Sequence, residues 1–459
     1  MEHPEWALKY RIKGTELRNI RGRYYLYNIT SRRDPETKKV KKVTLNQVGT
    51  ISEEYGLIPT GMKRKGKIPK GASPFKEEVK LDNNFTDAFE GKIEDTRTTK
   101  NLMYSMSELL FLAISAIICG AEGWNDMEIF GKTHIDYLRR YFDYKQGAPS
   151  SSTICRFFRN LDPDKFAMLF REWIANLASA VGAKVIAIDG KSSRHSYNRD
   201  KKGEETQMLH TVSAFASEAR IVLAQEKVSQ KSNEITAIPK LIEWLDIKRK
   251  IVTIDAIGCQ HSIAKQIIDK EGDYIFALKG NQGNLSKDVG EAFNSQTYPS
   301  KSYTDYDKGH GRIETRVCTI INEVEHLKAA HSKWSSIKSI IKIDSTREIK
   351  GNKTFETRYY ISSLHIEADK MLQAIRSHWG IENSLHWVLD MSFNEDCSRI
   401  RKDNAPQIAA ILRHISINLL QHFKTQKTGF ENASIKALRK ICGWNTKYLD
   451  LVISSKKTS

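Results

Sequence analysis

The sequence predicts an α/β protein in which a core of alternating strands and helices follows a helical segment and a β-rich, basic N-terminal segment. From residue 183 onward, short apolar runs typical of buried strands alternate with runs of helical periodicity. Apolar residues recur at helical spacing through residues 85–182, whereas residues 1–60 and 285–365 alternate in the manner of strands. A chain of 459 residues is long enough for two or three domains, each with its own core.

The N-terminal segment combines strand signals with a high positive charge. In residues 1–60, RGRYYLYNIT and KKVTLNQVGTI predict two strands, while residues 61–84 hold Gly, Pro and Lys without periodicity and predict a linker. Residues 1–80 carry 19 Lys/Arg against 9 Asp/Glu, which is more than half of the net charge of +18. With aromatic residues interleaved, this pattern favours an arm that contacts nucleic acid, and a solvated tail is the alternative.

The composition of the chain indicates the kind of partner it binds and the compartment in which it is found. A net charge of +18 favours a polyanionic partner, of which a nucleic-acid backbone is the commonest. The six cysteines are scattered without a CxxC pair, which indicates a reducing, cytoplasmic setting and argues against structural zinc. The most apolar stretch, LLFLAISAIICGA (109–121), is too short to span about 30 Å of hydrocarbon. We therefore predict a buried core helix there and expect no membrane partner.

A short helix in the segment 85–182 is the first candidate for DNA contact. PSSSTICRFFRNLD (149–162) predicts a helix with Ser/Thr capping residues at its start. Arg156 and Arg159 are three residues apart and share a face, which suits the second helix of a helix-turn-helix lying on DNA. A capped surface helix with two solvated arginines remains an equal alternative. We expect residues 85–182 to form a DNA-binding domain.

The core is predicted from its order of elements. The strand VIAIDG is followed by a hairpin, HTVSAFAS and RIVLAQEKVS, and then by two strands entered through helices, IVTIDAIG and DYIFALKG. Three strands in an antiparallel meander followed by two helix-connected strands are the order expected of an RNase H-like sheet. The first part of this core is predicted over residues 183–284, and its C-terminal helices and tail over residues 366–459.

Two aspartates follow apolar strand runs and are candidates for catalysis. Asp189 ends the run in AIDGK, and Asp255 ends the run in TIDAIG. A carboxylate in such a place is costly to bury unless it is paired or bound to a cation. On neighbouring strands the two carboxylates would repel each other, and Mg²⁺ or Mn²⁺ would relieve that repulsion. A third carboxylate would complete a site for two-metal phosphoryl transfer, although Rossmann-like enzymes and hydrolases also place Asp at strand ends.

The third carboxylate is left open by chemistry alone. Four candidates lie in one short region: Glu382, Asp390, Glu395 and Asp396. Glu382 is expected on a helix among apolar and aromatic neighbours, so it should point along a partly buried face. Glu395 and Asp396 lie in the polar stretch NEDCSRIRKD, where solvation or pairing with Arg399 and Arg401 is the natural expectation.

Eight phrases, taken together, resemble the DDE transposases of bacterial insertion sequences, the family that includes the H-repeat-associated proteins. They occur in family order over roughly residues 85–425: AIDGK, HTVSAF, KSNEITAIPKL, VTIDAIGCQ, DYIFALKGNQ, GHGRIETR, YYISSL and HWGIENSLHWVLDMSFNED. Each phrase alone is a weak signal, but eight in order are specific. The first sixty residues instead resemble the opening of a different group of insertion-sequence transposases.

This resemblance implies an RNase H-like catalytic core with Asp189, Asp255 and Glu382 as catalytic and metal-binding residues. The 127 positions that separate Asp255 from Glu382 are too many for a bare core, so residues 285–365 are interpreted as a β-rich insertion. The implied cofactor is Mg²⁺, with Mn²⁺ as a substitute. The implied partners are double-stranded DNA, as terminal inverted repeats and target DNA, and a second copy of the chain when DNA is bound.

Several basic residues are candidate DNA contacts. In the wider group of transposases a basic residue precedes the catalytic Glu by four positions; here that position is His378, with Arg376 two residues earlier. The remaining candidates follow core strands or lie in GHGRIE: Lys191, Lys279, His310 and Arg312. A solvated strand end is the alternative for the two lysines.

The resemblance implies an insertion-sequence transposase that cleaves DNA at its element ends and transfers the strands into target DNA. Two alternatives stay open. One is a non-catalytic DNA-binding protein derived from a transposase, and the other is a nuclease of the same fold that cleaves but never joins.

Overall fold

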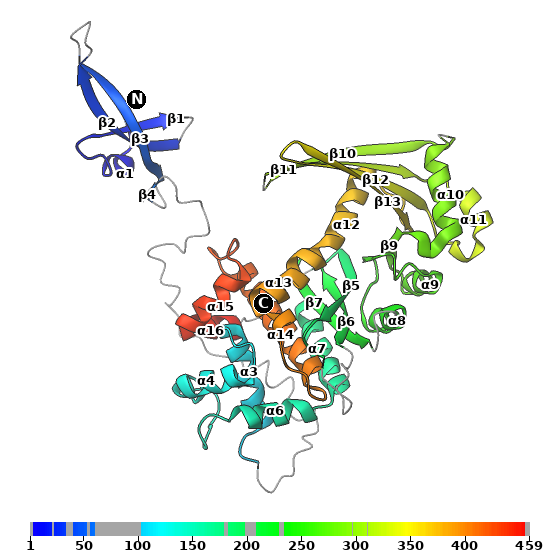
Figure 1. The fold of residues 1–459 in the computed structure, drawn as a ribbon, viewed down its shortest axis with the longest axis horizontal. Helices are drawn as coiled ribbons and strands as arrows, with labels where there is room; N and C mark the ends of the chain where they lie inside the picture. Colours follow the sequence, from blue (N-terminus) through cyan, green and yellow to red (C-terminus); the bar gives the residue numbers. More distant parts are fainter. Residues whose placement is uncertain are drawn as a thin grey trace. The chain divides into compact units, whose positions relative to one another are not determined.

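The computed structural model describes residues 3–20, 23–33, 40–52, 56–59, 102–178, 182–197, 208–228, 234–295, 297–309 and 311–454. The chain divides into two compact units (Figure 1). One comprises Met1–Val79 with Lys424–Ser434, and the other comprises Lys80–Phe423 with Ile435–Ser459. The predicted linker 61–84 lies outside the described residues.

The N-terminal unit contains a four-stranded antiparallel sheet in the order β1-β2-β3-β4. Its elements are α1 (Glu5–Leu8), β1 (Thr15–Ile20), β2 (Arg23–Arg33), β3 (Val40–Ser52) and β4 (Gly56–Pro59). The two strands predicted from the sequence are confirmed as β2 and β3. Ala7, Leu17, Leu26 and Ile51 form its small buried core.

A group of helices precedes the central sheet. These helices are α3 (Met106–Cys119), α4 (Trp124–Thr133), α5 (Ile135–Leu138), α6 (Ser151–Asn160) and α7 (Pro163–Ala178). The apolar stretch in α3 is a buried helix, as predicted, and a capping box between Ser105 and Glu108 starts it. Within the described ranges no single helix is long and apolar enough to cross a membrane; only the bent pair α3–α4 reaches that length and composition.

The second unit is built on a nine-stranded mixed sheet in the order β10-β11-β12-β13-β9-β8-β5-β6-β7. Its first five strands are β5 (Val185–Ser193), β6 (Leu209–Ala216), β7 (Ile221–Val228), β8 (Ile251–Ile254) and β9 (Asp273–Leu278). They confirm the predicted meander followed by two helix-connected strands, because β5, β6 and β7 pair antiparallel while β8 and β9 run parallel to β5. The connecting helices are α8 (Glu234–Trp244) and α9 (His261–Asp269).

The β-rich stretch 285–365 continues this same sheet, because β13 pairs antiparallel with β9. Its elements are α10 (Gly283–Asn294), β10 (Ser300–Gly309), β11 (Arg312–Ile321), α11 (Glu325–Ala330), β12 (Ser339–Ile349) and β13 (Asn352–Ser362). Apolar side chains of β11 and β12, such as Ile320 and Ile341, pack with Met371 and Ile375 of the next helix. This stretch therefore forms a continuous surface with the core strands.

The C-terminal elements are α12 (Ala368–Ile381), the π-helical turn η5 (Glu382–His386), α13 (Trp387–Phe393), α14 (Ala405–Gln426), α15 (Ile435–Trp444) and α16 (Thr446–Ile453). Of the C-terminal helices, α12 lies across the sheet, whereas α15 and α16 pack against α3 (Figure 1). Short 3₁₀ turns complete the unit: η3 (Gly280–Gln282), η4 (Ser332–Trp334) and η6 (Glu395–Cys397). Helix α12 contacts β5, β8, β10 and β11, so it joins the core strands to the strands that extend them.

One side chain ties α14 to the edge strand β7. The buried amide of Asn418 accepts a hydrogen bond from the Val222 N–H (2.8 Å) and donates one to the Val222 carbonyl (2.9 Å). The Asn418 side chain thus satisfies the two backbone groups of Val222 that a neighbouring strand would otherwise bind.

We expect Asn418→Leu to lower the free energy of unfolding by about 2–4 kcal/mol, because two buried backbone groups lose their partners. Urea denaturation followed by tryptophan fluorescence measures this change. The matched control Asn294→Leu alters an exposed residue at the end of α10 and should change stability by less than about 0.5 kcal/mol. Equal effects of the two substitutions would contradict a stabilising role for the Asn418 side chain.

Candidate active site

Asp189 and Asp255 lie next to each other because of the parallel register between β5 and β8. Ile188 is the partner of Ile254, so the residues that follow them, Asp189 and Asp255, occupy neighbouring positions. Parallel strands are separated by about 4.8 Å. The prediction that Asp189 ends its strand is wrong, since β5 continues to Ser193 and pairs Asp189 with Ser213. Strand β8, by contrast, ends at Ile254, so no strand continues beside Asp189 on the side where β8 pairs with β5.

The loop after β8 holds Asp255 in place. The Asp255 carboxylate accepts hydrogen bonds from the N–H groups of Ile257 (3.0 Å) and Gly258 (3.4 Å). Two side chains from η3 fasten the same loop: the Asn281 amide donates to the Ala256 carbonyl, and the Gln282 amide donates to the Cys259 carbonyl. These turn residues therefore position the candidate site.

Burial and mutual repulsion make both aspartates weaker acids than usual. Burial, followed by the charge of Asp255, raises the pKa of Asp189 from 3.8 to about 7. Burial also raises the pKa of Asp255, and hydrogen bonds from Gly258 and Ile257 partly offset that rise. Two carboxylates that resist simultaneous ionisation form a site where a cation would be strongly stabilising.

Glu382 begins the π-helical turn between α12 and α13. Single π-helical turns inside α-helices occur frequently at functional sites. The side chain lines a cavity of about 280 Å³ together with Asp255, Thr253, Lys279 and Arg358. Burial raises the pKa of Glu382, the positive charge of Arg358 opposes this, and the charge of Asp255 adds to it. The structure thus brings Glu382 and Asp255 to one cavity, with Asp189 within electrostatic range.

The other three candidates for the third carboxylate are neutralised within the chain. Lys191 donates to Asp390 (2.7 Å) and to Asp396 (3.3 Å), and its own side chain is only 10% exposed. Glu395 is buried against Arg413 at 3.3 Å. Lys191, predicted as a DNA contact with a solvated strand end as the alternative, is instead largely enclosed in these ion pairs. A solvated Glu395 is likewise not observed, because its side chain is buried.

The partners expected for Glu395 and Asp396 also differ from the observed ones. Asp396 pairs with Arg194 and Lys191 rather than with Arg399 or Arg401. In contrast, the Glu382 carboxylate makes no hydrogen bond or ion pair within the described part of the chain. Glu382 is the member of the four whose charge is left available to a ligand.

The donor set fits a divalent cation in its chemistry. Three carboxylates supply the oxygen ligands that Mg²⁺ prefers, and Asp255 raises the pKa of each of the other two. Among the described residues, no group of three or more His, Cys, Asp or Glu side chains is already gathered to hold a metal ion. The three carboxylates therefore fit a divalent cation by residue type and charge, and their side chains would have to move closer together to bind it.

Two neutral histidines support the carboxylates from the helix. His378 Nδ1 lies 3.1 Å from Thr253 Oγ1, and burial lowers the pKa of His378 to about 4. His386 Nδ1 lies 3.5 Å from the Asp189 carboxylate, and burial together with Lys191 lowers its pKa to about 3. Both rings are uncharged at neutral pH, so His378 brings no positive charge to a phosphate.

A buried hydrogen-bonded chain beside Asp189 was missed from the sequence. Glu234 accepts a hydrogen bond from His210 Nε2 (2.7 Å), and His210 Nδ1 lies 2.8 Å from Ser192 Oγ. The negative charge of Glu234 raises the pKa of both Asp189 and Asp255. His210 and Glu234 belong to the phrases HTVSAF and KSNEITAIPKL, so the signal was present but carried no spatial information.

The remaining predicted DNA contacts are dispersed. Arg156 is exposed on α6, whereas Arg159 pairs with Asp403 at 2.5 Å. Helix α6 follows the four-residue α5 after a long connection, so the short turn of a helix-turn-helix is not found before it. Lys279 is exposed at the candidate site, and His310 lies outside the described residues. Arg312 and Arg376 line a second cavity next to the site.

The raised pKa of Asp189 predicts a pH-dependent stability in the absence of divalent ions. A carboxyl group whose pKa is raised on folding favours the folded state fully below its unfolded value of 3.8. That contribution is lost as the pH rises through about 7. With a chelator present, Asp189→Asn should therefore exceed the wild type in stability at pH 8 by about 2–4 kcal/mol, and the two should converge at acidic pH.

Urea denaturation at several pH values measures this difference. The control Asp143→Asn, at an exposed position, should follow the wild type throughout. Added Mg²⁺ should stabilise the wild type and leave Asp189→Asn unchanged. If the stability of the wild type and of Asp189→Asn changed with pH in the same way, repulsion between Asp189 and Asp255 would be ruled out.

Gly190, which has no side chain, lets the buried Glu234–His210 pair pack close to β5. A Cβ atom at Gly190 would lie 2.5 Å from Glu234 Oε1 and 2.9 Å from His210 Nε2. We expect Gly190→Ala to lower the free energy of unfolding by about 1–3 kcal/mol by displacing this pair. Gly283→Ala, where no atom lies within 4 Å, is the control and should be neutral or stabilising in a urea titration. Equal stability of both variants would contradict the close packing.

Comparisons with known proteins place the chain in a family. The Transposase DDE domain matches residues 181–419, and a DDE_Tnp_1-associated domain matches residues 87–174. The "H repeat-associated putative transposase YhhI" of Escherichia coli (strain K12) is 41% identical over 352 residues, covering 75% of this chain and 92% of the relative. The "Putative transposase YncI" of Escherichia coli O157:H7 is 40% identical over 369 residues, 79% of this chain and 93% of the relative.

Among solved structures, a piggyBac transposase synaptic complex with hairpin DNA is similar with a TM-score of 0.37 and 10% identity, over 81% of this chain and 76% of that one. At this score the similarity does not establish a shared fold. The domain match covers half of the chain, and the relatives are matched over nearly their full length. The chain therefore belongs to the DDE-domain transposase family, together with the H-repeat-associated transposases.

Proposed function

We propose that this protein is a metal-dependent DNA transposase that cleaves DNA at the ends of its element and joins the freed 3′-hydroxyls to target DNA. The observation that carries this proposal is the placement of three carboxylates. Asp189 and Asp255 are neighbours by strand register, and Glu382 shares a cavity with Asp255. The carboxylates that compete with Glu382 are neutralised by Lys191 and Arg413.

We further propose that the core is RNase H-like. The strand order β7-β6-β5-β8-β9, with an antiparallel meander and two parallel strands, supports this assignment. The proposed site takes one carboxylate from the first strand of this sheet, one from the end of the fourth and one from a C-terminal helix. Asp189 on β5, Asp255 after β8 and Glu382 after α12 have these origins.

Asp189, Asp255 and Glu382 would hold Mg²⁺, with Mn²⁺ as a substitute. When bound, such an ion promotes ionisation of the attacking hydroxyl and stabilises the leaving oxygen of an in-line displacement. The chain itself fixes the ligands. Ile257 and Gly258 hold Asp255 by backbone N–H groups, and the contact of Thr253 with His378 fixes α12 one turn before Glu382.

Basic groups around this cavity would orient the DNA. Lys279 is exposed on the cavity wall and can contact a phosphate next to the scissile bond. Arg358, which lines the same wall, favours the ionised form of Glu382. The basic N-terminal unit and Arg156 are further candidates for contact with the terminal repeats. Joining two element ends would require two copies of the chain on DNA.

Substitution of the third carboxylate tests the proposal. We expect Glu382→Gln to reduce Mg²⁺-dependent cleavage of the element ends by about a thousandfold or more, since a ligand to the ion is lost. Its affinity for the same DNA should not fall. The control Glu367→Gln changes an exposed residue that pairs with Lys301 at the start of α12 and should cleave like the wild type.

Cleavage and strand-transfer products on radiolabelled element ends give the readout. Full activity of Glu382→Gln would refute the assignment of the third ligand. A wild type that binds the ends but never cuts them would instead indicate a non-catalytic DNA-binding protein. Cleavage without strand transfer would identify a nuclease.

A further inference from the structure

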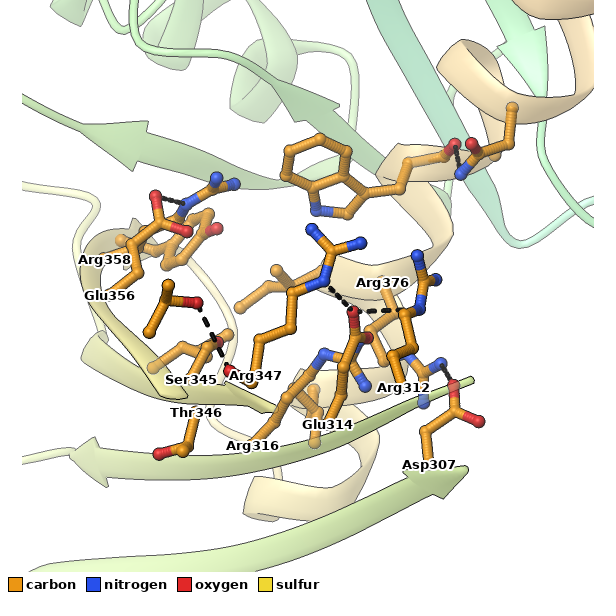
Figure 2. A pocket seen from close by; sticks show the side chains of 18 of the residues that line it. Asp307, Arg312, Glu314, Arg316, Ser345, Thr346, Arg347, Glu356, Arg358 and Arg376 are labelled. Atoms are coloured by element: carbon orange, nitrogen blue, oxygen red, sulfur yellow. Dashed lines mark hydrogen bonds and ion pairs between the residues drawn. The ribbon is translucent and has the colours of Figure 1, made fainter. Parts of the chain in front are cut away.

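A second and larger cavity lies between strands β11–β13 and helix α12 (Figure 2). Its volume is about 700 Å³. It is unusual in its arginine content: Arg312, Arg316, Arg347, Arg358 and Arg376 all line it. Such a concentration of guanidinium groups on one wall is costly unless anions are nearby.

Three of these arginines share a single carboxylate. Glu314, which is only 11% exposed, pairs with Arg312 at 3.2 Å, with Arg347 at 3.3 Å and closely with Arg316. Figure 2 shows the side chains of Arg312 and Arg347 converging on Glu314. One carboxylate neutralises one unit of positive charge. The group of Arg312, Arg316 and Arg347 around Glu314 is here called the Glu314 cluster. Its three arginines face this one carboxylate and, at 3.6 Å from Arg316, Asp305.

An unsatisfied donor lies in the same cluster. Arg316 Nη1 is buried and, within the described part of the chain, has no hydrogen-bond acceptor. The Asp305 carboxylate is 3.6 Å from this atom, beyond hydrogen-bond distance, and already accepts from Arg376 at 2.6 Å. A buried donor without an acceptor is rare in folded proteins. An anion bound beside Arg316 would supply this acceptor.

The other two arginines of the cavity are compensated. Arg376 pairs with Asp305 and with Asp307, and Arg358 pairs with Glu356 at 2.7 Å. Arg312, Arg316, Arg347 and Arg376 together thus face three carboxylates, Glu314, Asp305 and Asp307, which leaves one positive charge in excess. Arginine favours phosphate because its planar donors match two oxygens at once.

The cavity is continuous with the candidate active site. Arg358 and Trp379 line both cavities, and Asn383, which follows Glu382 directly, lines the larger one. A nucleic-acid strand placed with its scissile phosphate at Asp255 and Glu382 would extend along α12 toward the Glu314 cluster. Arg312 and Arg347, whose side chains are 40% and 46% exposed, can each face one phosphodiester group of that strand.

We propose that the Glu314 cluster binds two neighbouring phosphodiester groups of the DNA strand that enters the active site. This proposal rests on the proposed function, because it assumes DNA at the three carboxylates. Pyrophosphate and nucleotides offer the same chemistry in a free ligand, and the experiment must separate them from DNA.

The test uses the full-length chain with Asp255→Asn as an uncut background, so that binding is read independently of cleavage. In this background, Arg312→Gln/Arg347→Gln is compared with Arg249→Gln, which removes an exposed arginine at the opposite end of β8 from Asp255. Arg316 still pairs with Glu314 in the double variant, so no buried carboxylate is left alone. Fluorescence anisotropy with an element-end duplex is measured over a series of salt concentrations.

We expect the double variant to bind at least about tenfold more weakly than Arg249→Gln, and its salt slope to fall by about 2 relative to the uncut background. Replacing the phosphates near the scissile bond one at a time by neutral methylphosphonates should weaken binding by the uncut background at two adjacent positions. The double variant should be insensitive at those positions, since the contacts are already lost. Unchanged affinity and slope in the double variant would overturn the proposal.

Two further measurements separate binding from other roles. The melting temperature of the double variant without DNA should equal or exceed that of the background, because repulsion is relieved. A lower melting temperature combined with unchanged DNA affinity would assign the cluster a structural role and overturn the proposal. Pyrophosphate should not compete with DNA below millimolar concentration; tight, arginine-dependent pyrophosphate binding with unaltered DNA affinity would overturn it in favour of a free ligand. Failure of the proposed function would instead appear as a wild type without cleavage.

Discussion

Electrostatic repulsion between two carboxylates placed side by side is the constraint on which this structure depends. The register Ile188–Ile254 makes Asp189 and Asp255 neighbours, and the early end of β8 leaves them facing open space. Burial and mutual charge then raise the pKa of Asp189 to about 7. The fold maintains this unfavourable pair, which agrees with the proposal that both residues bind a divalent cation.

The surroundings pair competing charges with one another and hold the two aspartates in place. Lys191, which lies two residues after Asp189, engages Asp390 and Asp396 and so removes two competing carboxylates. Neutral histidines face Asp189 and Thr253, and hydrogen bonds from η3 brace the loop that carries Asp255. The π-helical turn starts at Glu382, where the helix passes the cavity. Each contact supports the position of a carboxylate without neutralising it.

The same sheet carries a second electrostatic imbalance of the opposite sign. Because β13 pairs with β9, the arginine-bearing strands form one surface with the core, and α12 spans both. Helix α12 therefore runs from the excess negative charge at Asp189, Asp255 and Glu382 to the excess positive charge around Glu314. A polyanion that needs a cation at one phosphate and arginines at its neighbours complements this arrangement.

The sequence by itself determined the five core strands, the buried helix α3 and the family, because strand periodicity, capping and eight ordered phrases are local signals. It also singled out Asp189 and Asp255. Chemistry left four carboxylates near the C-terminus open, and the family resemblance pointed to Glu382. Only the tertiary structure showed that Asp390, Asp396 and Glu395 have basic partners elsewhere in the chain. The Glu234–His210 pair and the Glu314 cluster are likewise contacts between separate elements, which pairing and packing create and local sequence does not specify.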